Sequence, residues 1–115
     1  MVLDEKLCVI YEPMFDLFPC RLYEDSISGF RNVMFRELLD ERGFHCIATN
    51  HQEREMGLLN IVVTKRSERA IGFAGATRIG EEMAKYGIGL ESFSADEMWQ
   101  GNGGAHCMTC PFLLG

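Results

Sequence analysis

The stretch that decides the fold runs from Leu58 to Phe93 and reads LLNIVVTKRSERAIGFAGATRIGEEMAKYGIGLESF. It contains two β-rich segments, 58–64 and 69–73, joined by a polar turn, which predicts a pair of strands. Residues 76–86 follow with apolar side chains at helical spacing, and Gly87 is suited to end that helix. Residues 88–93 are typical of one more strand. The stretch therefore predicts the element order β-β-α-β.

The first half of the chain predicts the same order. We expect a hairpin over 1–12, an irregular segment over 13–25, a helix over 27–42, a strand over 44–48 and a polar loop over 49–55. The helix is predicted from apolar residues at helical spacing, which are Phe30, Val33, Met34 and Leu38. Ser26 or Ser28 is expected to cap this helix and Gly43 to end it.

These elements predict an α/β fold built from two β-β-α-β modules. The chain has 115 residues, of which 47% are hydrophobic and 24% charged, as in an ordinary globular protein. This length suits a single domain, 1–115, with submodules at approximately 1–50 and 56–115.

Charge and hydropathy exclude several classes of partner. Lys and Arg number 11 against 17 Asp and Glu, for a net charge of −6, and the basic residues are dispersed. Nucleic-acid binding needs clustered basic residues, so we expect no nucleic acid. Apolar runs are too short for a membrane span, and Asp4 and Glu5 stand where a secretory signal would need basic and apolar residues. We expect a cytoplasmic protein without a membrane partner.

Five cysteines are present: Cys8, Cys20, Cys46, Cys107 and Cys110. An odd number without a secretory signal predicts reduced thiols in a cytosol-like compartment.

The segment that carries chemistry leads to Cys107. Gly103 and Gly104 precede it, and glycines let a backbone approach a ligand closely. A glycine-rich loop running into a cysteine is typical of a nucleophilic thiolate with loop groups around the reacting centre. Cys107 is thus the candidate catalytic residue, and Asn102, Gly103 and Gly104 are the candidate substrate-binding residues.

Other interpretations of the same residues stay open. A lone cysteine is often a small buried hydrophobe, and the spacing of Cys107 and Cys110 also fits a redox pair. If the segment is extended, His106 faces away from Cys107. Zinc needs four ligands where one Cys-x-x-Cys pair is present, so we expect neither a metal nor a cofactor. Asn60, which interrupts an apolar strand, is expected to satisfy backbone groups rather than contact a ligand.

The segment 103–111, Gly-Gly-Ala-His-Cys-Met-Thr-Cys-Pro, resembles the C-terminal nucleophile motif of guanidine-modifying enzymes. These enzymes, the arginine deiminases and arginine:glycine amidinotransferases, form the pentein superfamily. An Asn-bearing apolar strand, a return strand and a helix precede the motif, as at 58–63, 69–71 and 76–86 here. The resemblance implies part of a pentein, or α/β-propeller, fold.

The resemblance also implies a mechanism. The Cys107 thiolate attacks the guanidinium carbon of arginine or a relative, a histidine protonates the departing amine, and a covalent amidino-thioether remains. Water or an acceptor amine then releases it. Acidic side chains clamp the guanidinium.

The chain departs from this pattern in two respects. His45, His51 and His106 do not occupy the position of the general acid, and the clamping carboxylates of other modules have no counterpart. With two of five modules, the chain is similar to the C-terminal part of such an enzyme, and its open flanks predict self-association or a missing N-terminal portion. We therefore expect a truncated guanidine-modifying module that is inactive alone. The alternatives are a small-ligand binding or assembly module and a thiol-redox protein.

Overall fold

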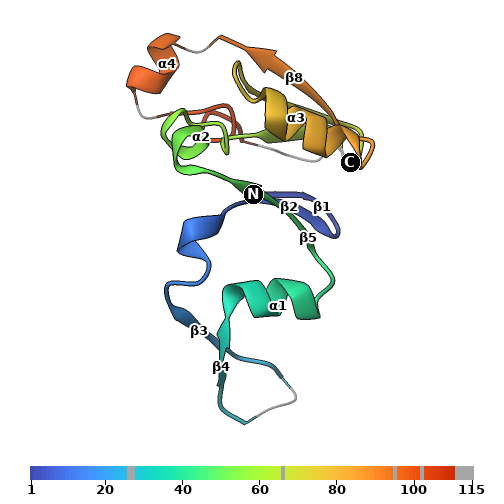
Figure 1. Cartoon of the computed structure of the whole chain (residues 1–115), viewed down its shortest axis with the longest axis vertical. Helices are drawn as coiled ribbons and strands as arrows, with labels where there is room; N and C mark the ends of the chain where they lie inside the picture. Colours follow the sequence, from blue (N-terminus) through green and yellow to red (C-terminus); the bar gives the residue numbers. More distant parts are fainter. Residues whose placement is uncertain (26–27, 66, 95, 102, 111–115) are drawn as a thin grey trace.

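The computed structural model describes residues 1–25, 28–65, 67–94, 96–101 and 103–110 (Figure 1). Within them the protein is a mixed α/β structure with the strands distributed over three small sheets. Its elements are β1 (Val2–Asp4), β2 (Leu7–Tyr11), the 3-10 helix η1 (Glu12–Met14), β3 (Pro19–Leu22), β4 (Arg31–Met34), α1 (Phe35–Glu41), β5 (His45–Thr49), α2 (His51–Glu55), β6 (Val62–Lys65), β7 (Arg69–Phe73), α3 (Thr77–Ala84), β8 (Gly89–Phe93) and α4 (Asp96–Gln100).

Two sheets share one topology, as the sequence predicts. In the first, β1 pairs antiparallel with β2 and β2 pairs parallel with β5. In the second, β6 pairs antiparallel with β7 and β7 pairs parallel with β8. We call the first sheet with α1 the first unit, and the second sheet with α3 the second unit. α1 lies between β2 and β5 in the chain, and α3 between β7 and β8. The β-β-α-β order is therefore confirmed for the second half, whereas in the first half two further strands, β3 and β4, stand between β2 and α1. The described strands form no closed barrel.

Strand β2 is buried on both faces, which explains its unbroken apolar run. Leu7 and Val9 belong to the larger apolar cluster of the molecule, while Cys8 and Ile10 belong to a smaller cluster beneath Leu39 of α1. Successive strand residues point to opposite faces, so one strand separates two cores. The larger cluster also contains Ile79 and Met83 of α3, four residues apart and both fully buried, together with other residues of the second unit.

The helix predicted over 27–42 begins later than expected. Residues 31–34 form β4, and the N-cap of α1 is Met34, whose backbone N–H donates to the Glu37 carboxylate at 3.0 Å. Ser28 therefore does not cap the helix, and Ser26 lies outside the described residues. The helix ends as predicted, because Gly43 adopts a φ of +70° just after the C-cap Arg42.

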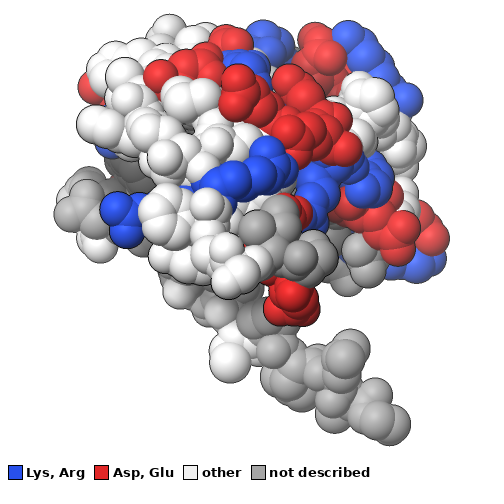
Figure 2. All heavy atoms as spheres, turned by 90° about the horizontal axis from the view of Figure 1, so that it is seen from below, with Lys and Arg blue, Asp and Glu red and all other residues white. Residues whose placement is uncertain are grey.

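The segment 13–25 is not irregular throughout. Its residues 19–22 form β3, which pairs antiparallel with β4 so that Cys20 faces Val33 in the register. Figure 1 shows this β3–β4 hairpin projecting from the first unit, at the end of the molecule opposite α4. We call it the arm. Viewed from this end, basic and acidic side chains are interleaved (Figure 2), and Arg31, for example, pairs with Glu24 and Glu41.

Two further predictions need correction. The polar segment 49–55 contains α2, because the Asn50 side chain accepts the Glu53 N–H at 2.9 Å and the Glu53 carboxylate accepts the Asn50 N–H at 2.9 Å. The strand predicted from residue 58 begins at Val62 instead. Residues 58–61 form an irregular approach to the sheet, in which Leu58 and Ile61 are buried.

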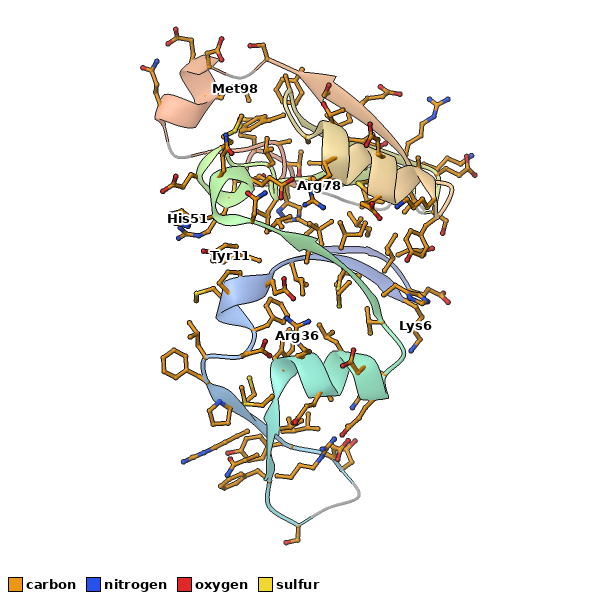
Figure 3. The ribbon with its side chains drawn as sticks, in the orientation of Figure 1. Lys6, Tyr11, Arg36, His51, Arg78 and Met98 are labelled. Atoms are coloured by element: carbon orange, nitrogen blue, oxygen red, sulfur yellow. The ribbon has the colours of Figure 1, made fainter. Side chains whose placement is uncertain are left out.

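Arg78 of α3 ties the second unit to α2 and β5. Its guanidinium donates to both carboxylate oxygens of Glu53, at 2.7 and 2.6 Å, and to the Ala48 carbonyl at 2.7 Å. Figure 3 shows Arg78 between these elements. The ion pair lowers the pKa of the Glu53 carboxyl below its ordinary value, against the opposing effect of burial. Among the described residues, no helix is long and apolar enough to cross a membrane.

Candidate functional site

The site is organised by Asn60, which joins two segments far apart in the sequence. Its carboxamide oxygen Oδ1 accepts the backbone N–H of His106 at 2.6 Å and that of Cys107 at 3.3 Å. Its nitrogen Nδ2 donates to the Cys107 sulfur at 3.0 Å. One side chain thus holds both the backbone and the thiol of the candidate nucleophile.

The local fold fixes Asn60 in place. Leu58, two residues before it, and Ile61, directly after it, are 2% and 0% exposed, so the chain on both sides of Asn60 is anchored in the core. The Asn60 backbone N–H donates to the Gly57 carbonyl at 3.0 Å. Because the two backbone N–H groups require an oxygen opposite them, the amide is oriented with Nδ2 toward the sulfur. An N–H donor beside sulfur stabilises the thiolate, which is the nucleophilic form of cysteine.

Gly104 allows the loop to lie directly on Asn60. A Cβ at Gly104 would lie 2.2 Å from Cγ and 2.5 Å from Cβ of Asn60, far inside van der Waals contact. A side chain is therefore excluded at this position unless the loop or Asn60 moves. Gly103 differs, because a Cβ there would meet the Met98 carbonyl at an ordinary 3.9 Å. Of the predicted substrate-binding residues, Gly104 thus has a packing role against Asn60, and Asn102 lies outside the described residues.

The segment around Cys107 is a turn rather than a strand. The Met108 N–H donates to the Gly104 carbonyl at 3.2 Å, and the Thr109 N–H donates to the His106 carbonyl at 3.0 Å. The strand alternation that would turn His106 away from Cys107 therefore does not apply. Cys107 and Cys110 are both exposed, and all five cysteines are free thiols.

Two hollows adjoin this loop, and His106 lines both. The first, of about 410 Å³, is lined by Met1, Val2, Val62, Val63, Thr64, His106, Thr109 and Cys110. The second, of about 450 Å³, is lined by Met1, Tyr11, Met14, Arg54, Gly57, Leu59, Asn60 and His106. We call the second the Asn60 hollow. Among its lining residues that the structure describes, Arg54 is the charged side chain and no Asp or Glu occurs.

A hydrogen bond and an ion-pair contact link Tyr11, which lines the Asn60 hollow, to α2. The Tyr11 hydroxyl lies 3.0 Å from Nδ1 of His51, and Nε2 of the same imidazole lies 3.0 Å from Glu55. Arg54 places its guanidinium 5.3 Å from the centre of the Tyr11 ring. Figure 3 shows Tyr11 and His51 side by side where the two units meet.

The buried thiol of Cys8 differs sharply from that of Cys107. Its sulfur lies 3.5 Å from Cys46 on the neighbouring strand, and burial is the main cause that raises the pKa of Cys8 to about 12. Cys8 is therefore a protonated core residue at neutral pH, as the alternative interpretation of a cysteine describes.

Sequence reasoning missed the contribution of Asn60. The expectation that it satisfies backbone groups is correct, but those groups belong to the loop 106–107 and the same amide also contacts the thiol. Its one available signal was a polar residue interrupting an apolar segment. Tyr11 and Arg54 carried no signal, because their approach depends on the tertiary fold.

No protein-family model matches this sequence. In the described part of the chain, no three His, Cys, Asp or Glu side chains are grouped so that they could hold a metal ion.

Proposed function

We propose that this chain is a guanidine-modifying module in which Cys107 is the nucleophile. The observation that carries the proposal is the contact between Asn60 Nδ2 and the exposed Cys107 sulfur, at 3.0 Å. An exposed thiol with an oriented amide donor is suited to react, whereas a cysteine retained for packing would be buried like Cys8.

The reaction follows from the electrophile. The Cys107 thiolate forms a bond to the guanidinium carbon, and the tetrahedral intermediate collapses as the carbon–nitrogen bond to the departing amine breaks. The product is an amidino-thioether on Cys107. Water converts it to a ureido product, or an acceptor amine takes the amidino group, and both regenerate the thiol. A thiol nucleophile requires reduced cysteines, so we assign the protein to a cytoplasmic compartment.

The site favours slow turnover by this chain alone. A bound guanidinium is best stabilised by paired carboxylates, and the described residues around the Asn60 hollow include none. We infer that a second copy or a further segment completes the clamp, and that the isolated chain forms the thioether more readily than it turns over arginine.

The test is selective labelling of the five cysteines with 2-chloroacetamidine, an amidine electrophile, followed by peptide mapping. We expect Cys107 to react faster than the exposed Cys20 and Cys110. The matched variant is Asn60→Asp, which keeps an oxygen for both backbone N–H groups and removes the donor to sulfur. Losing a hydrogen bond to a charged group costs about 1.5–3 kcal/mol, so labelling of Cys107 should slow about 10- to 100-fold.

Other labelling patterns contradict the proposal. Equal labelling of Cys20, Cys107 and Cys110 would favour a binding or assembly module. Coupled oxidation of Cys107 and Cys110 would favour a redox protein. An unchanged rate in Asn60→Asp would show that the amide does not act on the sulfur.

A further inference from the structure

The Asn60 hollow contains a proton-bearing group that the guanidine chemistry requires. Expulsion of an amine from carbon needs a proton on the departing nitrogen. Tyr11, Asn60 and His106 line one hollow, and the Asn60 amide contacts the Cys107 sulfur. Tyr11 therefore borders the hollow that adjoins the nucleophile loop.

We propose that Tyr11 protonates the departing amine, and that His51 and Glu55 are positioning residues that replenish its proton. This inference rests on the proposed function of Cys107. The contacts that carry it are the hydrogen bond between the Tyr11 hydroxyl and His51 Nδ1 and the ion-pair contact between His51 Nε2 and the Glu55 carboxylate, each at 3.0 Å.

The protonation state of His51 decides the direction of the Tyr11 hydroxyl. The Glu55 carboxylate, 3.0 Å from Nε2, favours a proton on that nitrogen. When the imidazole is neutral, Nδ1 is an acceptor and the Tyr11 O–H points to it. When the imidazole is protonated, Nδ1 donates to the Tyr11 oxygen and the hydroxyl proton is free to point into the hollow. Only the second state offers a proton to the ligand.

Charges around Tyr11 support this role. The Arg54 guanidinium, 5.3 Å from the ring centre, stabilises the phenolate that remains after proton transfer. The titratable or charged groups around Tyr11 include His51, with Glu55 behind it, and Arg54 from α2. Across the hollow they include His106 from the nucleophile loop and Met1, which carries the terminal ammonium group.

The step balances without a co-reactant. The sulfur–carbon bond forms, the carbon–nitrogen bond breaks, and its electron pair stays on the departing nitrogen. That nitrogen takes the Tyr11 proton, and the phenolate takes the Nδ1 proton of His51. His51 ends neutral and keeps its remaining proton on Nε2, beside the Glu55 carboxylate.

The experiment compares two electrophiles on the full chain. Transfer from N-(4-nitrophenyl)guanidine expels an amine, 4-nitroaniline, which is coloured, whereas 2-chloroacetamidine expels chloride and needs no proton. Both rates depend on the reactivity of the same thiolate, so this contribution divides out of their ratio at one pH. The ratio then reports the effect of the proton donor on the departure of the amine. In the wild type the ratio should fall as the pH rises, because the neutral imidazole of His51 accepts the Tyr11 hydroxyl proton in a hydrogen bond.

The variants give the inference its test. Tyr11→Phe should lower the ratio about 10²–10⁴-fold, the contribution typical of a general acid, with chloroacetamidine labelling retained. His51→Gln should lower the ratio and remove its pH dependence. Tyr23→Phe is the matched control, because that exposed tyrosine lies on the arm and packs on Phe30.

Failures of the two claims are distinguishable. Absence of preferential chloroacetamidine labelling at Cys107 would overturn the proposed function. Preferential labelling with an unchanged ratio in Tyr11→Phe, or an unchanged pH profile in His51→Gln, would overturn the role of Tyr11 and leave Cys107 as the nucleophile.

Discussion

Replacing Gly104 by alanine should separate Asn60 from the nucleophile loop. The added Cβ would lie 2.2 Å from Asn60 Cγ, more than roughly 1 Å short of the 3.4 Å at which ordinary contact begins. Asn60 cannot swing aside cheaply, because its own Cβ would also lie 2.5 Å away. A displacement of this size breaks the 3.0 Å contact between the amide and the sulfur.

The expected magnitudes follow from packing and hydrogen bonding. Overpacking costs about 1–3 kcal/mol, so the free energy of unfolding of Gly104→Ala should fall by that amount. Loss of the donor to the thiolate should slow labelling of Cys107 about 10- to 100-fold. Urea unfolding gives the first quantity, and 2-chloroacetamidine labelling with Cys20 as internal standard gives the second.

The matched variant is Gly103→Ala, whose Cβ would meet the Met98 carbonyl at 3.9 Å. Its unfolding free energy should stay within about 0.5 kcal/mol of the wild type, as is usual for unstrained surface changes. The reasoning is refuted if Gly104→Ala keeps both the stability and the labelling ratio of the wild type.

Three further predictions concern the rest of the molecule. Arg78→Met should lower the unfolding free energy at pH 7 by about 2 kcal/mol, because it leaves the Glu53 carboxylate buried without its partner. The lowered pKa of Glu53 stabilises the fold above about pH 4.3 and loses that contribution as the pH falls through the folded value, so acid titration of stability should be shallower in the variant. Cys8, whose pKa is about 12, should resist alkylation at pH 9 until urea unfolds the chain, as counted by thiol titration before and after unfolding. Large apolar side chains are exposed on the arm and directly before it, including Tyr23 at 67% and Phe18 at 72%, so sedimentation equilibrium should detect self-association that Phe18→Ser weakens. A wild-type monomer of 13.0 kDa would contradict this.

The elements set by local pattern were predictable from the sequence. The polar turn at 4–6, the strand 69–73 and the buried α3 positions Ile79 and Met83 all follow from spacing and hydropathy. The order β-β-α-β follows from their succession. That these modules form part of a pentein fold stays a prediction.

The missed elements depend on contacts between distant residues. Phe30, Val33 and Met34 fit helical spacing, yet pairing with β3 makes 31–34 a strand. The partner strand, β3, lies in a segment whose sequence shows no clear periodicity, so this pairing could not be predicted. The site shows the same limit, because the segment containing Cys107 could be recognised locally, whereas Asn60 lies 47 residues away and reaches the thiol only in the folded chain.

The central claim, that Cys107 attacks a guanidine carbon, is tested most directly by locating a transferred amidino group. The chain is incubated with N-(4-nitrophenyl)guanidine, digested, and each cysteine peptide is examined by mass spectrometry. We predict one amidino group on the peptide containing Cys107, released together with 4-nitroaniline and absent in Cys107→Ser. An unmodified Cys107, or modification spread equally over Cys20 and Cys110, would contradict the account.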